Sequence, residues 1–511
     1  MRNPFESVRL PETPIGRLKR RCDRLVHGDS TGGILLLAAV AVALLAANSA
    51  FADTYRGFWQ IPIGLSLGPW TIRHSLVHWI NDGLMTLFFF HVGLHIKREL
   101  IFGEFRQGRA MVLPMMAAIG GMVVPALIFF TLIRDASARS AWGIPMATDI
   151  ALVVGVLALL GNRVPHGLKI FVLSLAIVDD IGAILVIAFF YSSYISLAAL
   201  AVAAALLGAI VGLNRLGVRQ VPAYLVLGGG VWFACLHSGV HPTIAGVALG
   251  LLTPASAWIG TRSLRDVMAT ILPASPPHDA SAPHPESAPH PESAPHDAAP
   301  PREGPENLPD ITGPQARMLI HVARETVSPL ERLETALHPW VMFFILPLFA
   351  LANSAVALDL GLLSSDVSVG VAMGLAVGKP LGVMAFSLLA VWCFNATLMD
   401  RMSWPGILGA ACLTGIGFTM SIFITDLSLT GTLSDAGKGG TLIGSVVSCL
   451  LGLSVLYHVL PAATLAEVGD PMAGNGDAAI TVPAADLPSL ALTHDSRPPA
   501  IDAGQRRRDA A

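Results

Sequence analysis

Apolar runs long enough to cross a bilayer dominate the chain, and short polar segments separate them. A membrane-spanning helix needs about 20 consecutive, mostly apolar residues. The candidate runs, several of them short or broken, lie near residues 31–51, 76–96, 111–133, 144–160, 169–191, 196–213, 221–237, 241–252, 338–358, 367–392, 404–427 and 441–461. This pattern predicts an all-α polytopic membrane protein with about 12 transmembrane helices.

Composition and charge agree with that class. The 511 residues are 53% hydrophobic and 13% charged, with a mean hydropathy of +0.63, whereas soluble domains carry about 25% charged residues. If the N-terminus is cytoplasmic, most of the 32 Lys and Arg residues flank the spans on the cytoplasmic side, as positive residues usually do. Both termini are therefore predicted to be cytoplasmic. No basic face interleaved with aromatic residues is present, so nucleic acid is not expected as a partner.

The apolar runs fall into two blocks with polar segments around them. We expect a cytoplasmic N-terminal segment at 1–30, spans 1–8 at 31–255, a cytoplasmic linker insertion at 256–325, spans 9–12 at 326–461 and a disordered cytoplasmic tail at 462–511. The insertion is rich in Pro and His and repeats SAPHPE at 281–286 and 287–292, which favours an extended, mobile linker. Its evenly spaced histidines leave metal binding or pH sensing as an alternative.

Charged residues interrupt the spans at a few positions. Asp179 and Asp180 stand side by side in LSLAIVDDIGAI, and two other spans contain Asp149 and Lys379. An ionised carboxylate at the centre of a spanning helix costs about 2.5–3.5 kcal/mol on insertion scales. Charges at such depth usually mark an ion or proton pathway, so these four residues are the candidate site.

A purely structural ion pair between one aspartate and Lys379 is the simplest alternative, but it leaves the other carboxylates unexplained. Neighbouring helix positions point about 100° apart, so one of Asp179 and Asp180 can meet Lys379 while the other faces a cavity. Carboxylates together with the Thr148 hydroxyl and water suit Na+ or Li+, and protonation of the carboxylates removes the reason to hold a metal. Competition between H+ and Na+ for one site is antiporter chemistry.

Two other functions stay open at this point. An intramembrane aspartyl protease also needs two membrane aspartates, but it draws them from different helices, and no GxGD motif is present. An inactive homologue with a regulatory role is the third possibility. The residues alone do not determine whether the site prefers Na+, Li+ or K+.

Two spans contain helix-breaking residues at their centres, GIPMATDI in the fourth and LTGIGFTMSIF in the eleventh. In the predicted topology these spans run in opposite directions, so spans 3–5 and 10–12 are expected to form inverted repeats whose broken helices cross. Unwound backbone survives at membrane depth only inside protein or beside a cavity. The half-helix ends would place partial positive charge near Asp149 and partial negative charge near Lys379.

These residues together resemble the NhaA family of bacterial Na+/H+ antiporters. The matching segments, over about residues 12–255 and 325–460, are TDIALVVGVLALLGNRVP, LAIVDDIGAI, SGVHPTIAGV, ERLETALHPWVMFFILPLFALAN, GKPLGV and GIGFTMSIFI. The resemblance implies a secondary transporter of the bacterial inner membrane, not an enzyme. It implies electrogenic alternating-access exchange of two H+ for one Na+ or Li+ with no cofactor. It also implies a homodimer in the lipid bilayer, with a β-hairpin between the first two spans, for which 52–73 is long enough.

The resemblance also implies residue roles. Asp180 matches the principal cation ligand, and Asp179 matches its neighbour, assigned either to the same Na+ site or to a proton-sensitive bridge with Lys379. Thr148 and Asp149 match the broken-helix pair beside that site.

The expected pH-sensing region departs from the family pattern. Where members commonly read LEVKRE, this chain reads LHIKRE, with His95 in place of a glutamate and Glu99 retained. Glu334 and His338 fit the pattern at the start of the ninth span, whereas Glu331 and Thr335 replace a usual lysine and histidine. Histidine titrates near pH 6.5, well above a carboxylate, so the pH profile is expected to differ. His95, Glu99, Glu334 and His338 are the candidate pH sensors.

Overall fold

The computed structural model describes residues 29–67, 70–103, 111–192, 195–218, 221–256, 313, 317, 322, 325–356, 359–399 and 402–460. The chain divides into two compact units, Met1–Ala462 and Ala463–Ala511, and the second lies wholly outside these ranges. The predictions for residues 1–28, for the repeats of the insertion and for the tail therefore also lie outside the described residues.

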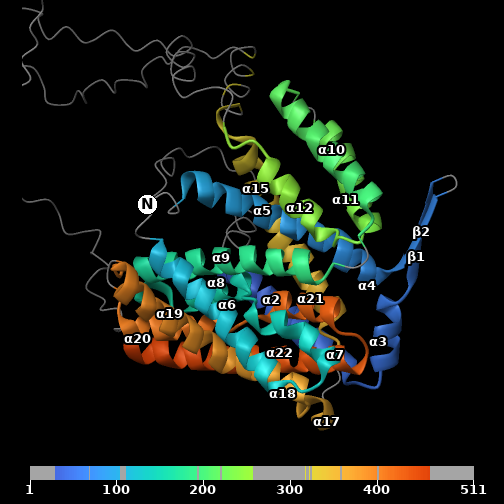
Figure 1. Cartoon of the computed structure of the whole chain (residues 1–511). Helices are drawn as coiled ribbons and strands as arrows, with labels where there is room; N and C mark the ends of the chain where they lie inside the picture. The colour runs from blue at the N-terminus through green and yellow to red at the C-terminus, as the bar shows by residue number, and fades with distance from the viewer. Residues whose placement is uncertain are drawn as a thin grey trace, which may run out of the picture. The chain divides into compact units, whose positions relative to one another are not determined.

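The described part is helical apart from one hairpin, and Figure 1 shows the arrangement. The helices are α2 (Asp29–Ala47), α3 (Ala52–Trp59), α4 (Leu76–His78), α5 (Met85–Phe102), α6 (Val112–Leu132), α7 (Ala136–Arg139), α8 (Ile150–Leu159), α9 (His166–Phe190), α10 (Leu197–Arg215), α11 (Val221–Ser238), α12 (Thr243–Leu252), α15 (Pro329–Trp340), α16 (Leu346–Asn353), α17 (Leu360–Leu363), α18 (Asp366–Met373), α19 (Lys379–Phe394), α20 (Trp404–Thr414), α21 (Phe418–Ser428) and α22 (Thr432–Val459). Wider π-helical turns join α4 to α5, α15 to α16 and α18 to α19, and a 3₁₀ segment, Ser140–Met146, precedes α8.

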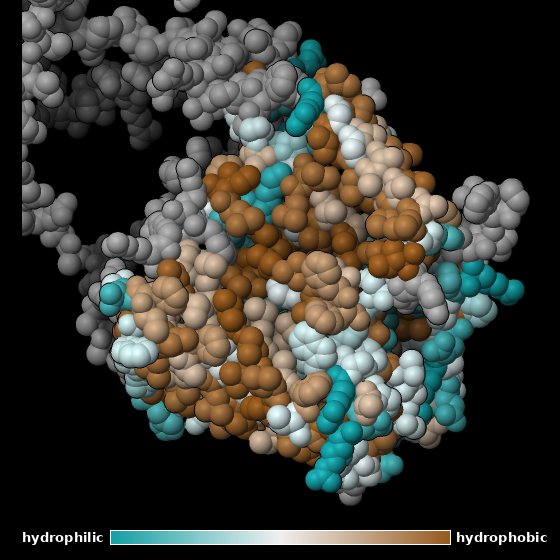
Figure 2. Space-filling view, viewed as in Figure 1, coloured by the Kyte–Doolittle hydropathy of each residue, from teal (hydrophilic) through white to brown (hydrophobic). Residues whose placement is uncertain are grey.

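The helices have the length and surface of membrane spans. Among the described residues, six helices or continuous helix pairs can cross a membrane, and the number rises to eight if each of two bent pairs is one span. Large apolar side chains such as Leu45, Phe189 and Trp392 are 73–83% exposed, which suits contact with lipid chains. Figure 2 shows how broadly apolar side chains cover one face. The chain is thus a multi-pass helical membrane protein.

Each predicted range overlaps a helix, and the boundaries differ most at the starts of the ninth and twelfth spans. The ninth predicted span starts at 338, whereas α15 starts at Pro329; the twelfth starts at 441, whereas α22 starts at Thr432. The first turns of α22 contain charged residues and glycines, which lower the hydropathy. They are nevertheless helical because Gly437 and Gly440 pack closely against Thr425 of α21 and the backbone of Ser368 in α18.

The expected hairpin between the first two spans is present. Strand β1 (Pro62–Leu67) pairs antiparallel with β2 (Trp70–Ser75), with Pro62 opposite Ser75. The Trp79 indole N–H donates to the Ile63 carbonyl at 3.1 Å and ties the hairpin to the start of the following helix.

Small residues allow close helix crossings around the site. Helices α6 and α19 cross where Gly120 and Gly382 face each other, and a Cβ on either glycine would collide with the other's carbonyl oxygen. Close backbone approach of this kind is typical of membrane helices, which gain little from the hydrophobic effect when they associate in lipid. The crossing fixes Lys379, at the start of α19, next to α6.

One aromatic ring connects α21 to three other segments. The Phe423 ring, 1% exposed, lies 5.6 Å from Phe89 of α5, 6.2 Å from Phe349 of α16 and 5.4 Å from His241 before α12, measured between ring centroids. We call Phe89, Phe349 and His241 the aromatic socket of Phe423. It joins a broken helix to segments that lie far away in sequence.

Candidate functional site

Two broken helices meet at the candidate site, as the sequence predicted. The segment Ala136–Met146 and α8 form an angle of 42°, and α20 and α21 form an angle of 44°. The breaks touch each other, because the Asp149 N–H donates to the Ile416 carbonyl at 2.7 Å. Gly415 is required at its break, since a Cβ there would meet the Leu375 carbonyl oxygen and the Ser448 side chain.

Asp149 lies at the N-terminal ends of two half-helices. Its Oδ1 caps α8 by accepting from the Leu152 N–H at 3.2 Å. Its Oδ2 accepts from the Thr419 N–H at 3.1 Å and from the Thr419 hydroxyl at 2.6 Å, at the start of α21. The partial positive charge of both helix ends therefore falls on one buried carboxylate, as expected from the sequence.

Lys379 is fully buried and makes two polar contacts. Its Nζ lies 2.9 Å from Asp179 Oδ2, and it donates to the carbonyl of Met146, at the C-terminal end of the 3₁₀ segment. The corresponding carbonyl on the second broken helix, Thr414, accepts instead from the Thr148 hydroxyl at 3.0 Å. Lys379 thus contacts one of the two predicted negative helix ends, and Thr148 contacts the other.

The two adjacent aspartates have different surroundings. Asp179 Oδ2 contacts Lys379 and accepts from the Thr148 hydroxyl at 2.6 Å, while Oδ1 is buried without a hydrogen-bond partner. Asp180 is 5% exposed, and its carboxylate has no hydrogen bond or ion pair within the described ranges. It interacts through space with Asp179, Asp149 and Lys379.

The charges of this cluster do not balance when all groups are ionised. Three buried carboxylates, Asp149, Asp179 and Asp180, face one ammonium, Lys379. Asp149 is stabilised by helix ends and Asp179 by the lysine, so Asp180 is the carboxylate without a compensating group in the described structure. A buried carboxylate in this situation favours binding a cation or a proton.

The candidate pH sensors are brought together only in part. His95 Nδ1 and Arg98 Nη1 each lie 3.1 Å from Glu334 Oε1, so α5 and α15 are linked. The His338 ring faces the His91 ring of α5 at 5.7 Å between centroids. Glu99 lies one turn beyond His95, and its side chain forms no hydrogen bond or ion pair with the residues described.

The sequence reasoning missed several residues at and near the site. Thr419 was noted only as part of a helix break, and Ser445 was given no role. The Ser445 hydroxyl accepts from the N–H groups of Gly417 and Phe418 at 3.2 Å each. Asp82 lies apart from the cluster, with Oδ2 at 3.1 Å from His78 Nε2 and Oδ1 at 3.8 Å from His241 Nε2. Single Ser, Thr and His residues in apolar runs carry too weak a signal to be assigned.

Apolar helices that enclose two crossed helix breaks and a group of buried carboxylates define a membrane transporter of small cations. Residues 23–456 match the family described as Na+/H+ antiporter 1. The chain belongs to this family; it is a secondary transporter that exchanges sodium for protons and not an enzyme, which removes the protease alternative.

Curated relatives cover nearly the whole chain. It is 42% identical to the Na(+)/H(+) antiporter NhaA of Rhodopirellula baltica over 89% of this chain and 98% of that protein. Identity is also 42% with NhaA 2 of Sorangium cellulosum, over 92% and 96% of the two chains. With NhaA of Rhizobium meliloti it is 40%, over 88% and 97%.

Proposed function

We propose that this antiporter expels Na+, or Li+, from the bacterial cytoplasm across the inner membrane in exchange for two H+ per cation. The supporting observation is the pair of adjacent aspartates, since Asp180 and Asp179 Oδ1 have no hydrogen-bond partner within the described structure. Oxygen atoms with unused lone pairs in a buried, negatively charged site are ligands for a hard cation and equally bases for protons.

Each residue has its own role in the proposed cycle. Asp180 is the principal Na+ ligand, and Asp179 joins it after releasing Lys379. Thr148 lies between Asp179 and the end of α20, and its single hydroxyl proton can serve only one of these acceptors at a time. Asp149 belongs, with Thr148, to the cation- and proton-binding group, and Asp149 and Lys379 also stabilise the broken helices. Protonation of both Asp179 and Asp180 neutralises the pair and releases the cation, which gives two H+ per Na+.

The proposed membrane arrangement has twelve spans with both termini in the cytoplasm. Spans 3–5 and 10–12 are inverted repeats, a proposal that the similar angles of 42° and 44° at the two breaks support. Residues 31–255 and 326–461 form the transmembrane domain, and 1–30, 256–325 and 462–511 are cytoplasmic. The hairpin β1–β2 is the proposed contact between two copies in a homodimer.

Transport stoichiometry gives a direct test with the full-length protein in proteoliposomes. Two H+ per Na+ moves one net charge per cycle, so an inside-negative potential imposed in the physiological orientation should drive Na+ out without a ΔpH. The reversal potential should match a 2:1 exchange, with Na+ and Li+ accepted. Transport that does not respond to the potential would contradict the electrogenic proposal.

We further propose that the His95–Glu334–Arg98 contact regulates activity with pH. Protonated His95 carries a positive charge that attracts the Glu334 carboxylate, so the link between α5 and α15 is stronger in acid than in alkali. We expect His95→Gln to shift the pH of half-maximal activity towards acid and to make the profile shallower. Exposed His166 supplies the control, His166→Gln. Superimposable profiles for His95→Gln and the unsubstituted protein would rule out this sensor.

A further inference from the structure

The half-helix α21 connects the site to an ion pair formed by Asp426, inside the predicted eleventh span, and Lys438, between the predicted eleventh and twelfth spans. Thr419, at its first turn, donates two hydrogen bonds to Asp149. Asp426 lies two turns later on the same helix, about 10 Å along the axis at 1.5 Å per residue. A helix of this length behaves as a short rigid rod, so fixing its second end restricts the position of its first.

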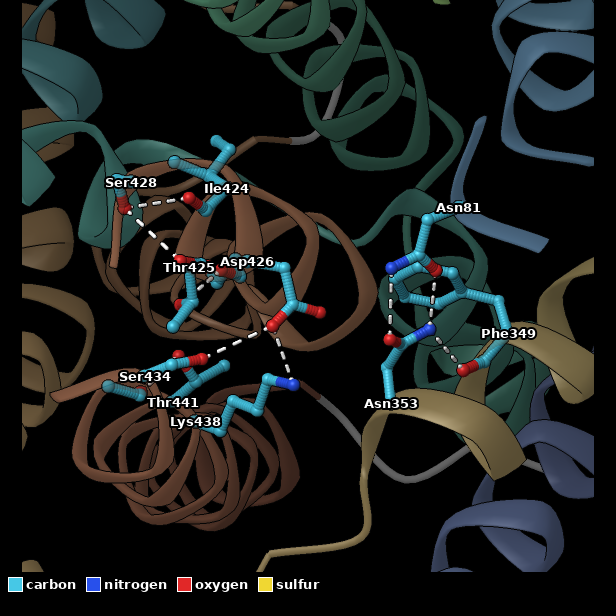
Figure 3. Close-up of polar contacts among 12 residues, drawn as sticks. Asn81, Phe349, Asn353, Ile424, Thr425, Asp426, Ser428, Ser434, Lys438 and Thr441 are labelled. Atoms are coloured by element: carbon cyan, nitrogen blue, oxygen red, sulfur yellow. Dashed lines mark hydrogen bonds and ion pairs between the residues drawn. The ribbon is translucent and has the colours of Figure 1, made fainter. Parts of the chain in front are cut away.

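The second end of α21 is fastened to α22 by charge. Asp426 Oδ1 lies 2.6 Å from Lys438 Nζ and accepts from the Ser434 hydroxyl at 3.2 Å, and Figure 3 shows these groups pointing towards each other. Both charged side chains are largely buried, at 19% and 14% exposure, so water screens the attraction less than at an open surface.

Packing and hydrogen bonds complete the attachment of α21 to α22. Gly437 lies so close to α21 that a Cβ there would come within 2.8 Å of Thr425 Cγ2. At the other end of α21, the N–H groups of Gly417 and Phe418 donate to the Ser445 hydroxyl of α22. The Thr425 and Thr441 hydroxyls donate within their own helices, so they do not link the two. Among the described ion pairs, Asp426–Lys438 is the link between these helices.

We propose that Asp426 and Lys438 are positioning residues for cation binding: by fixing α21 on α22 they set how Thr419 meets Asp149. They touch neither the cation nor the reacting carboxyl groups. The inference rests on the proposed assignment of Asp149 to the cation site. The neighbouring Asn81–Asn353 pair in Figure 3, with amide contacts of 2.8 and 3.2 Å, joins other segments and is not part of this attachment.

The test measures initial rates of Na+-dependent ΔpH collapse in everted vesicles against Na+ concentration. Lys438→Met and Asp426→Asn should each raise the KM for Na+ about fivefold, with Vmax within about a factor of two of the unsubstituted protein. The charge-swapped double variant, Asp426→Lys with Lys438→Asp, should recover a KM near the original. Asp366→Asn, which removes an exposed carboxylate from the first turn of α18, is the control and should leave KM unchanged. Unchanged KM in both single variants overturns the proposal, whatever happens to thermal stability.

A double-mutant cycle with Thr419→Val separates positioning from general stability. If the ion pair acts through Thr419, the double variant Thr419→Val with Lys438→Met should have the same KM as Thr419→Val alone. If the two substitutions raise KM independently, so that their effects add, the proposal is wrong. Lys438→Arg keeps the positive charge and replaces Lys438→Met in the test if that variant does not reach the membrane. The KM for Na+ of Lys438→Arg should stay within about twofold of the value for the unsubstituted protein. An unchanged KM in Asp149→Asn would refute the Asp149 assignment itself, which distinguishes failure of the proposed site from failure of the ion pair.

Discussion

Asp180→Asn is expected to abolish Na+-dependent collapse of a preformed ΔpH in everted vesicles. The amide has the shape of the carboxylate but carries no negative charge and cannot release a proton near neutral pH. It therefore removes the cation ligand and one of the two proton carriers together. Because Asp180 has no hydrogen-bond partner in the described structure, the substitution takes no partner away from a neighbouring group, and the protein should still fold.

Two measurements make this prediction specific. Na+ should raise the thermal stability of the purified unsubstituted protein, because a ligand that binds only the folded state stabilises it, and this rise should vanish in Asp180→Asn. Asp366→Asn removes an exposed carboxylate from the first turn of α18 and should retain both transport and the Na+-dependent rise. Full transport by Asp180→Asn would remove Asp180 from the site.

Lys379→Ala is expected to lower the free energy of unfolding by about 3–5 kcal/mol, the usual result of removing one member of a buried ion pair. Lys379 is 0% exposed and Asp179 is 1% exposed, so removing the ammonium leaves a carboxylate unpaired in the protein interior. The Met146 carbonyl loses its donor at the same time. Thermal unfolding of the purified variant measures the loss.

The matched control for Lys379 removes both charges. Asp179→Asn combined with Lys379→Met leaves neither an ammonium nor a carboxylate unpaired, so it should recover most of the stability while remaining defective in transport. A Lys379→Ala protein as stable as the unsubstituted one, with an unchanged pH profile, would show that the Asp179–Lys379 contact carries neither stability nor proton coupling.

The energetic cost of charge in a membrane made the central residues predictable. Asp149, Asp179 and Asp180 could be selected from sequence because few other carboxylates occur inside apolar runs, and Lys379 because it was the matching cation. Helix breaks were predictable for a similar reason, since Pro and Gly at membrane depth must be accommodated by neighbouring protein. The structure brings these residues together as expected.

Other parts of the site depend on geometry that hydropathy does not encode. Thr419 and Ser445 are ordinary hydroxyl residues in sequence, and only the crossing of the broken helices gives them partners. Lys438 falls between the predicted eleventh and twelfth spans because its turn of helix is polar and glycine-rich. The turn is helical because its glycines pack against α21 and α18, which no local pattern reveals. Within the described residues the Glu99 side chain has no hydrogen bond or ion pair, and its role as a pH sensor stays a prediction.

The aromatic socket sets an energetic cost on movement of α21. Phe423 lies one turn after Thr419 on α21, so a shift of that half-helix away from the socket separates the ring from Phe89, Phe349 and His241. Exposing a buried phenylalanine costs about 1.5–3 kcal/mol, enough to make an opened state roughly ten to a hundred times rarer. A smaller side chain at position 423 would lower that cost, so the packing of one ring helps to set how readily α21 can move.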